Sequence, residues 1–187
     1  MPFLFESPRI IARPFELHDE SDLIEYQSDE SVVRYIPWPK RSREQVHEAL
    51  IKSMEATNFT ENEDHLDFVW QLKETGKVIG QSNIGLVAKE HNHAEIGWVM
   101  NPAYSGQGYA TEITDALITF AFATFDLHRI SAYIDQRNVA SIRVAERLGM
   151  RLEAHYKEDE LFKGEWVSGN LYAVLKSEWK QKSPPEN

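Results

Sequence analysis

The stretch that decides the fold is NPAYSGQGYATE, residues 101–112, a glycine-containing turn between an expected strand and an expected helix. Before it, residues 94–100 (AEIGWVM) alternate in hydrophobicity, which predicts a strand. After it, apolar residues recur at helical spacing from Ile113 onward. Gly106 and Gly108 leave consecutive backbone N–H groups uncrowded at the start of that helix. Such a helix N-terminus predicts a phosphate-binding site.

The glycine pattern alone is common, and its simplest interpretation is a tight strand-to-helix connection that binds nothing. It lacks the third glycine of a dinucleotide-binding fingerprint, and no Lys-Ser/Thr pair follows Gly108 as it would in a P-loop. The phosphate-binding interpretation therefore needs support from the rest of the chain.

The composition limits the class of protein. The 187 residues are 42% hydrophobic, which suits one globular domain with a buried core. The chain has no cysteine, which excludes disulfides, thiolate metal sites and a cysteine acyl-enzyme. The net charge of −10 argues against nucleic-acid binding and favours cationic partners such as amines. No membrane-spanning apolar run or signal-peptide pattern occurs, so we expect a cytoplasmic protein with no membrane partner.

Hydrophobic periodicity and turn residues predict a mixed α/β chain. Strands are expected near 9–14, 67–73, 77–87, 94–100, 129–134, 151–157 and 171–175, and helices near 18–28, from 42, from 109 to about 125 and at 138–148. Ser42 and Gln45 form an expected capping box. Trp166 and Trp179 are expected to pack near the last strands. We expect a single domain over residues 1–182 and a disordered tail at 183–187.

Further motifs accompany the glycine turn. They are EIGW at 95–98, Pro102, FAF at 120–122, Asn138-x-x-Ser141 and ERLGM at 146–150. With GQGYATE at 106–112, they resemble the GNAT superfamily of N-acetyltransferases, in particular its ribosomal-protein alanine N-acetyltransferase branch (RimJ/RimL type). The likeness runs from about Arg9 to about Trp179. It implies a GNAT-like fold, in which a central, mostly antiparallel twisted sheet is splayed between its fourth and fifth strands and carries helices on both faces.

The resemblance also implies that acetyl-CoA is the co-substrate. The glycine turn would hold the pyrophosphate, and the preceding strand would pair with the pantetheine arm. The residues expected to bind it are therefore Val99, Met100, Gly106, Gln107, Gly108, Tyr109, Ala110 and Thr111. Ser105 stands where the family pattern has arginine or glutamine, so backbone amides are expected to carry most of the binding. No metal is expected, because His91 and His93 have no obvious third ligand.

Asn138 and Ser141 have both a structural and a functional interpretation. Asn138 suits a helix N-cap whose side chain accepts a hydrogen bond from the amide of Ser141 or its neighbour. The resemblance adds that this helix start points at the cofactor arm, which makes Asn138 a cofactor-binding residue. Many superfamily members place a tyrosine acid four residues beyond Ser141, where this chain has Ala145. Ser141 is then the expected partner of the departing thiolate, and a purely structural serine is the alternative.

The attacking amine must lose a proton, and two carboxylates are candidates for accepting it. Glu160 aligns with the carboxylate thought to hold a water against the amine in RimL-type enzymes. Its alternative interpretation is a solvent-facing member of an acidic loop. Glu95 matches a position where other superfamily branches keep their base, and its alternative role is structural.

The sequence thus predicts an N-acetyltransferase that moves the acetyl group of acetyl-CoA to a primary amine by direct attack in a ternary complex. The acceptor is either a protein N-terminal α-amine or a small-molecule amine, and the protein is a monomer or a homodimer. The main alternative is a non-catalytic acyl-CoA-binding module that lost its acid at position 145. A weaker alternative is a nucleotide-binding regulator that uses the glycine turn.

Overall fold

The computed structural model describes residues 3–55 and 65–182. The chain divides into two compact units. The first unit comprises Met1–Gly85 and Gly97–Ala116, and the second comprises Leu86–Ile96 and Leu117–Asn187. The single domain expected over residues 1–182 stays a prediction, and the tail expected at 183–187 lies outside the described residues.

The strands form one mostly antiparallel sheet in the order β1-β2-β3-β4-β5-β6-β8-β7. These strands are β1 (Phe5–Glu6), β2 (Ile10–Arg13), β3 (His65–Leu72), β4 (Val78–Ala88), β5 (His93–Met100), β6 (Arg129–Asp135), β7 (Arg151–Phe162) and β8 (Glu165–Leu175). β5 and β6 run parallel, and their pairing joins His93–Glu95 to residues 129–131. They are the fourth and fifth of the expected strands, so the parallel pair falls where the predicted splay does. The mixed α/β fold is confirmed, and the splay itself stays a prediction.

Helices and 3-10 turns connect the strands. They are η1 (Leu17–Asp19), α1 (Glu20–Gln27), α2 (Glu30–Val33), α3 (Arg43–Glu55), η2 (Lys89–His91), η3 (Pro102–Tyr104), α4 (Tyr109–Thr124), α5 (Val139–Arg147) and α6 (Lys176–Lys182). The capping box before α3 is confirmed, because the Ser42 amide donates to Gln45 Oε1 at 2.9 Å and the Gln45 amide donates to Ser42 Oγ at 3.3 Å. Within the described residues, no helix is both long and apolar enough to cross a lipid bilayer.

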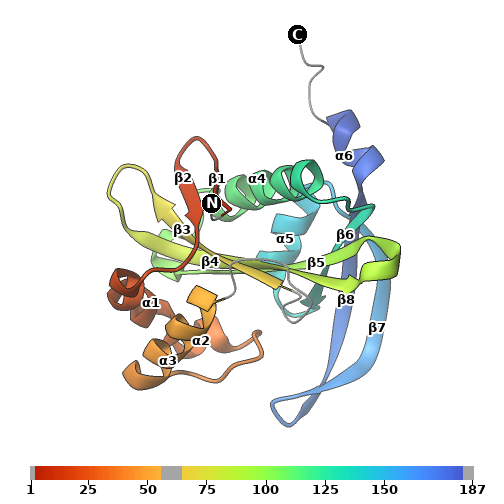
Figure 1. Cartoon of the computed structure of the whole chain (residues 1–187). Coiled ribbons are helices and arrows are strands. Elements are labelled where there is room, and N and C mark those ends of the chain that lie inside the picture. Colours follow the sequence, from red (N-terminus) through yellow and green to blue (C-terminus); the bar gives the residue numbers. More distant parts are fainter. Residues whose placement is uncertain (1–2, 56–64, 183–187) are drawn as a thin grey trace. The chain divides into compact units, whose positions relative to one another are not determined.

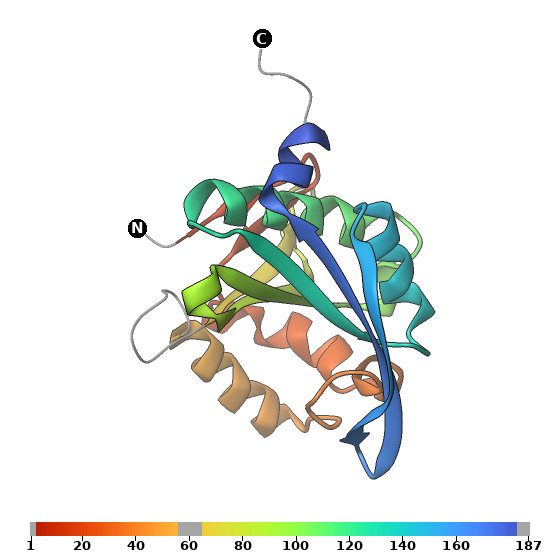
Figure 2. The ribbon, with the colours of Figure 1, turned by 90° about the vertical axis from the view of Figure 1, so that its right-hand side faces the viewer.

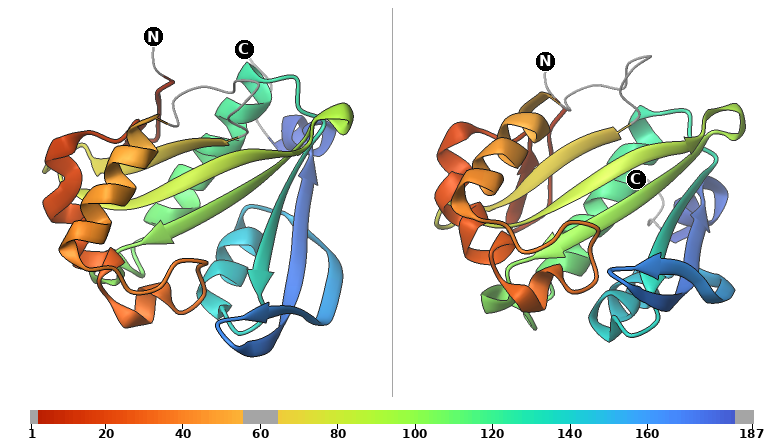
Figure 3. Two further views of the ribbon diagram at one scale, coloured as in Figure 1. Left: turned by 60° about the horizontal axis from the view of Figure 1, so that its bottom comes forward. Right: turned by 90° about the horizontal axis from the view of Figure 1, so that it is seen from below.

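The first unit has an apolar core between its helices and its strands. α1 packs beside α3 below the strands, while the start of α4 lies above them (Figure 1 and Figure 3). Val46 and Leu50 lie four residues apart, on one face of α3, and both are buried. This apolar face explains why α3 packs against the core. One buried cluster of this core comprises Phe15, Leu23, Tyr26, Val46, Leu50, Val69, Val78 and Val99.

A buried ion pair holds the connection from β2 to α1. The Arg13 guanidinium donates to both Asp19 carboxylate oxygens, at 2.7 and 2.9 Å, and the Asp19 carboxylate also accepts from the Glu16 amide at 2.8 Å. Asp19 precedes α1, but its side chain makes no capping hydrogen bond to the helix because Arg13 and Glu16 occupy it. Both charges are satisfied, which a buried pair requires.

The second unit is built on β6, β8 and β7, which lie consecutively in the sheet (Figure 2). α5 packs against β6, with Val144 and Ala145 buried. Trp179 of α6 is also buried, and its indole N–H donates to Thr119 Oγ1 at 3.0 Å. Trp179 therefore packs as expected. Trp166 does not, because it is 63% exposed on β8.

The last two strands are longer than the sequence predicted. β7 extends to Phe162 and β8 begins at Glu165, so the segment expected to be an acidic loop is part of a two-stranded hairpin. The prediction failed because β7 is the last strand of the sheet and almost all of its side chains are exposed. A strand exposed on both faces lacks the apolar alternation that identifies strands in a sequence.

Candidate functional site

The glycine turn follows β5 directly and begins with a buried asparagine. Asn101 Oδ1 accepts from the Ala103 amide at 3.0 Å, and its own amide donates to the Ile79 carbonyl at 2.8 Å. Its side-chain amide donates to Glu25 at 3.2 Å. The start of the turn is thereby held to two separate elements of the first unit.

Two left-handed residues shape the rest of the turn. Gly106 has φ 80° and Gly108 has φ 81°, a conformation in which a Cβ would be strained. α4 begins immediately afterwards at Tyr109, and the Glu112 amide donates to the Gly108 carbonyl within its first turn. The amides of residues 109–111 therefore precede the first intrahelical bond, which is the geometry that binds anions.

A carboxylate in the first turn of α4 is fully engaged. Glu112 Oε1 accepts from Ser7 Oγ at 2.7 Å and from the Arg9 amide at 2.9 Å, while Arg9 Nε donates to Oε2 at 2.7 Å. Burial acts to raise the pKa of Glu112, but the hydrogen bonds from Ser7 and Arg9 outweigh it and the pKa is lowered. Glu112 is thus ionised and paired at neutral pH, beside the turn that is predicted to bind phosphate.

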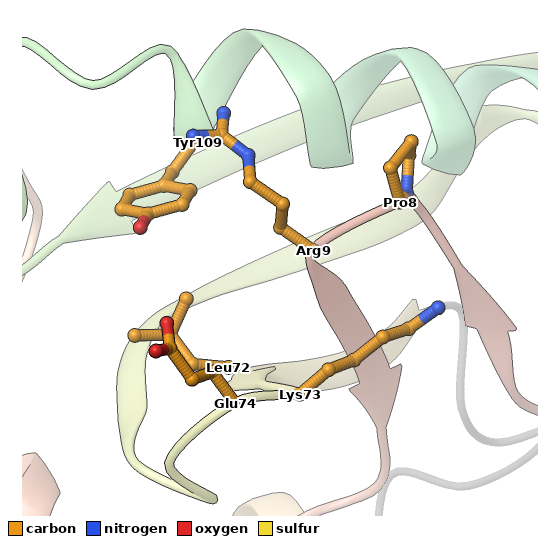
Figure 4. A pocket seen from close by; sticks show the side chains of 6 residues that line it. All are labelled: Pro8, Arg9, Leu72, Lys73, Glu74 and Tyr109. Carbon is orange, nitrogen blue, oxygen red and sulfur yellow. The ribbon is translucent and has the colours of Figure 1, made fainter.

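A pocket of about 350 Å³ lies on the β2 side of this helix start (Figure 4). It is lined by Pro8, Arg9, Leu72, Lys73, Glu74 and Tyr109. The lining includes Tyr109, one of the residues predicted to bind the cofactor. The guanidinium carbon of Arg9 lies over the Tyr109 ring, 4.2 Å from its centroid. The pocket thus marks the side of the helix start on which Arg9 lies.

The end of β5 carries the two residues expected to contact the pantetheine arm. Val99 is 9% exposed and belongs to the core of the first unit, and Met100 is half-buried. Gly80 of β4 comes close to the Val99 backbone, since a Cβ on Gly80 would lie 2.6 Å from the Val99 carbonyl oxygen. The backbone at Val99 is therefore fixed by close packing.

In the second unit, the start of α5 has the geometry that the sequence predicted. Asn138 is the N-cap, and its Oδ1 accepts from the Ser141 amide at 3.2 Å. Ser141 is half-buried in the first turn of the helix, and Ala145 is completely buried one turn later. The capping role of Asn138 is confirmed, and its contact with a cofactor stays a prediction.

Glu95 is half-buried on β5, in register with Ser131 of β6. Burial raises the pKa of its carboxyl group. Two residues earlier, His93 Nε2 lies 2.8 Å from Ser131 Oγ, and burial, together with the charge of Arg129, lowers the pKa of that imidazole. Among residues 3–55 and 65–182, no group of three or more His, Asp or Glu side chains could hold a metal ion.

Glu160 is exposed on β7, opposite Val167 of β8. It ends an irregular stretch of the pairing that begins at Tyr156. Within that stretch Glu158 has φ 50° and donates its amide to Ser168 Oγ at 3.0 Å, and Tyr133 donates its hydroxyl to Asp159 at 3.0 Å. Ser168 thus holds the backbone at Glu158, and Tyr133 holds the side chain of Asp159. The sequence analysis had left a solvent-facing acidic loop as the alternative for this segment.

Comparison with known proteins gives the family. The model of the acetyltransferase (GNAT) domain matches residues 9–151. The chain belongs to the GNAT family. YnaD of Bacillus subtilis (strain 168), an uncharacterized N-acetyltransferase, is 33% identical over 171 residues, which cover 91% of this chain and 96% of YnaD. The crystal structure of a GNAT-family acetyltransferase from Bacillus anthracis superimposes with a TM-score of 0.85 at 32% identity, over 94% of this chain and all of that one.

More distant GNAT structures share the fold. Spermidine N-acetyltransferase from Vibrio cholerae, in complex with CoA and spermine, has a TM-score of 0.76 at 19% identity, with 91% and 98% of the two chains covered. RimL, a ribosomal L7/L12 α-N-protein acetyltransferase in complex with coenzyme A, has a TM-score of 0.80 at 18% identity, with 92% and 98% covered. The superfamily assignment is confirmed, and the RimJ/RimL branch stays a prediction. Membership makes this chain an acetyl-CoA-dependent N-acetyltransferase.

The first unit brings together the GNAT residues predicted for the phosphates, and the second unit carries Ser141, Asn138, Glu95 and Glu160. The motif analysis missed Ser7 and Arg9, whose contacts with Glu112 hold the glycine turn. No local pattern could have found them, because Arg9 and Glu112 are 103 residues apart in the chain.

Proposed function

We propose that this GNAT protein binds acetyl-CoA with its phosphates at the glycine turn and transfers the acetyl group directly to a primary amine in a ternary complex. The observation that carries the proposal is the turn itself. Two left-handed glycines lead into the free amides of α4, and the nearby carboxylate of Glu112 is neutralised by Arg9. A Cβ built on Gly106 would have no atom within 4 Å, so the surface there is open to a ligand.

The roles of the thioester-side residues follow from their places on β5 and α5. Backbone groups of Val99 and Met100 bind the pantetheine arm and polarise the thioester carbonyl. Ser141 donates to the departing thiolate, which the N-terminus of α5 also stabilises. Buried Ala145 offers no acid of its own, so Ser141 is the hydroxyl that this part of the helix supplies.

Glu160 is the proposed general base, acting through a water held against the amine. Its exposure lets it meet an acceptor in solution. Nearby, Ser168 holds the backbone of Glu158 and Tyr133 holds the side chain of Asp159. Glu95 is the second candidate. The raised pKa of its half-buried carboxyl makes it a stronger base than an exposed glutamate.

The proposed acceptor is a primary amine, either a protein N-terminus or a small molecule. Relatives support both classes, since one acts on spermidine and another on a ribosomal protein. The net charge of −10 favours a cationic acceptor of either kind. The alternative, a non-catalytic acyl-CoA-binding module, would bind CoA equally well and differ only in turnover.

The deciding experiment follows acetyl-CoA consumption with a panel of amines, comprising peptides with N-terminal Ala or Ser, spermidine and an aminoglycoside. We expect at least one acceptor to be acetylated, with mass spectrometry locating the new acetyl group on a primary amine. Ser141→Ala should then lower kcat by a smaller factor than loss of the base, because the helix N-terminus still stabilises part of the thiolate charge. Tight CoA binding without turnover on any amine would instead identify a binding module.

A further inference from the structure

Arg9, the residue immediately before β2, contacts the glycine turn although about a hundred residues separate the two in the sequence. Its Nη2 donates to the Gln107 carbonyl at 3.0 Å, a residue 98 positions away, and its Nε donates to Glu112 at 2.7 Å. The guanidinium lies over the Tyr109 ring (Figure 4). A single side chain therefore contacts the turn, the first residue of α4 and the carboxylate one turn further on.

The bond to Gln107 orients a peptide group between the two left-handed glycines. In a planar trans peptide the carbonyl and the following N–H point in opposite directions. Because the Gln107 carbonyl points to Arg9, the Gly108 N–H points to the opposite side. Arg9 thereby selects the face of the turn to which this amide is presented.

The bond to Glu112 has an electrostatic consequence. An ionised carboxylate in the first turn of α4 would repel a phosphate bound at the same helix start. Arg9 Nη2 lies 2.6 Å from Glu112 Oε2, and the pair offsets that charge. Ser105, at the position where the family pattern has arginine or glutamine, brings no charge to the turn.

We propose that Arg9 is a positioning residue of the CoA-phosphate site, which orients the Gln107–Gly108 peptide and cancels the charge of Glu112. The segment between β1 and β2 thereby supplies the positive charge that Ser105 does not. The inference rests on the proposed function, and it goes beyond it by assigning a role to a residue outside the glycine motif.

The test compares CoA dissociation constants, measured by calorimetry, for Arg9→Met, Glu112→Gln and the double variant. Arg43→Met is the matched control, because Arg43 is also an exposed arginine of the first unit, paired with Glu20 at 3.3 Å. We expect Arg9→Met to weaken CoA binding by about tenfold, the scale of one charge-assisted hydrogen bond. Arg43→Met should stay within about twofold of wild type, as expected for an exposed pair.

The carboxylate variants separate a charge effect from a purely structural one. If Arg9 acts partly by cancelling the charge of Glu112, Glu112→Gln alone should bind CoA at least as tightly as wild type. The double variant should also bind more tightly than Arg9→Met, a non-additive result. If Arg9 and Glu112 only brace the fold, Glu112→Gln weakens binding and the double variant is no better than Arg9→Met.

Unchanged affinity in a folded Arg9→Met protein, or weaker binding by Glu112→Gln, overturns the inference while leaving the proposed function intact. Should Arg9→Met fail to fold by circular dichroism, Glu112→Gln carries the test by itself. A wild-type protein that does not bind CoA would overturn the proposed function, and this inference with it.

Discussion

The glycine turn of the first unit and the β7–β8 hairpin of the second unit are held in different ways. The turn accepts a hydrogen bond from Arg9 at Gln107 and donates hydrogen bonds from Asn101 to Ile79 and Glu25, and all three partners lie far from it in the sequence. The hairpin is held by its own strand pairing, by the pairing of β8 with β6, and by hydrogen bonds from Tyr133 to Asp159 and from Glu158 to Ser168.

The two regions have different parts in the proposed reaction: the glycine turn binds the cofactor, and the hairpin carries the proposed general base, Glu160. In the turn, Gly106 and Gly108 are constrained by their positive φ, and Asn101 and Gln107 are constrained by distant partners, so a change at these residues disturbs several contacts. Most side chains of β7 are exposed, so their chemistry can change at little cost to the core. A GNAT sequence therefore identifies its cofactor more firmly than its acceptor.

The largest expected effect tests the hairpin. Glu160→Gln keeps the size of the side chain but removes its basicity, so kcat should fall by about 10²–10⁴-fold. CoA affinity should not change, and the rate of the variant should rise with pH as more of the amine arrives deprotonated. Steady-state kinetics with the acceptor found in the amine panel measures both effects.

Glu95→Gln is the matched control for Glu160→Gln. It should retain most of the activity if the base lies on the hairpin. An inactive Glu95→Gln beside a nearly normal Glu160→Gln would move the base to β5 and remove the catalytic role proposed for the hairpin.

The second prediction changes a left-handed glycine in each region. Gly108→Val and Gly164→Val both force a branched residue to positive φ, at 81° and 88° respectively. The added strain, about 1–2 kcal/mol for such a residue, should lower the stability of both variants. Only Gly108→Val should also weaken CoA binding, by about 10- to 100-fold, because its side chain borders the proposed phosphate site. Calorimetry measures the CoA affinity of each variant, and urea unfolding measures its stability. If Gly108→Val binds CoA as tightly as Gly164→Val does, the phosphate-binding interpretation of the glycine turn is wrong.

The sequence predicted features that depend on local patterns better than features that depend on distant contacts. Gly106, Gly108, Asn138 and the Ser42–Gln45 cap were predictable because each is a local pattern with a local backbone consequence. The partners of the turn were not, since their contacts join residues far apart in the chain. The full extent of β7 was missed because an exposed edge strand carries no apolar alternation.

The third prediction concerns the support of the hairpin. A Cβ on Gly169 would clash with the ring of Tyr133, so Gly169→Ala should displace the tyrosine ring and break its bond to Asp159. We expect a loss of about 1–3 kcal/mol in the free energy of unfolding, the usual cost of overpacking. Tyr133→Phe removes the same hydroxyl without the steric conflict, so it should cost less. If Gly169→Ala and Tyr133→Phe prove equally stable, the ring does not depend on the space above Gly169.

The smallest expected effect is the pH dependence of Glu95. Burial raises the folded-state pKa of this carboxyl, so its favourable contribution is present below the unfolded value of 4.5 and is lost as pH rises through the folded value. Glu95→Gln should therefore gain stability relative to wild type as pH rises through this range, by less than about 1 kcal/mol. Thermal unfolding at pH 4 and pH 8 gives the stability difference between Glu95→Gln and wild type at each pH. If the stability of the variant relative to wild type falls with rising pH, the burial of the Glu95 charge is contradicted.

The contacts between Arg9 and Glu112 also bear on how the chain reaches its native state. Ser7 and Arg9 precede their partner, Glu112, by 105 and 103 residues in the chain. Contacts of such long sequence separation form slowly, because a large loop must close first. We therefore expect the glycine turn to acquire its final geometry late in folding. A chain that starts after Arg9 would keep residues 101–112 and still lack the contacts of Ser7 and Arg9 with Glu112.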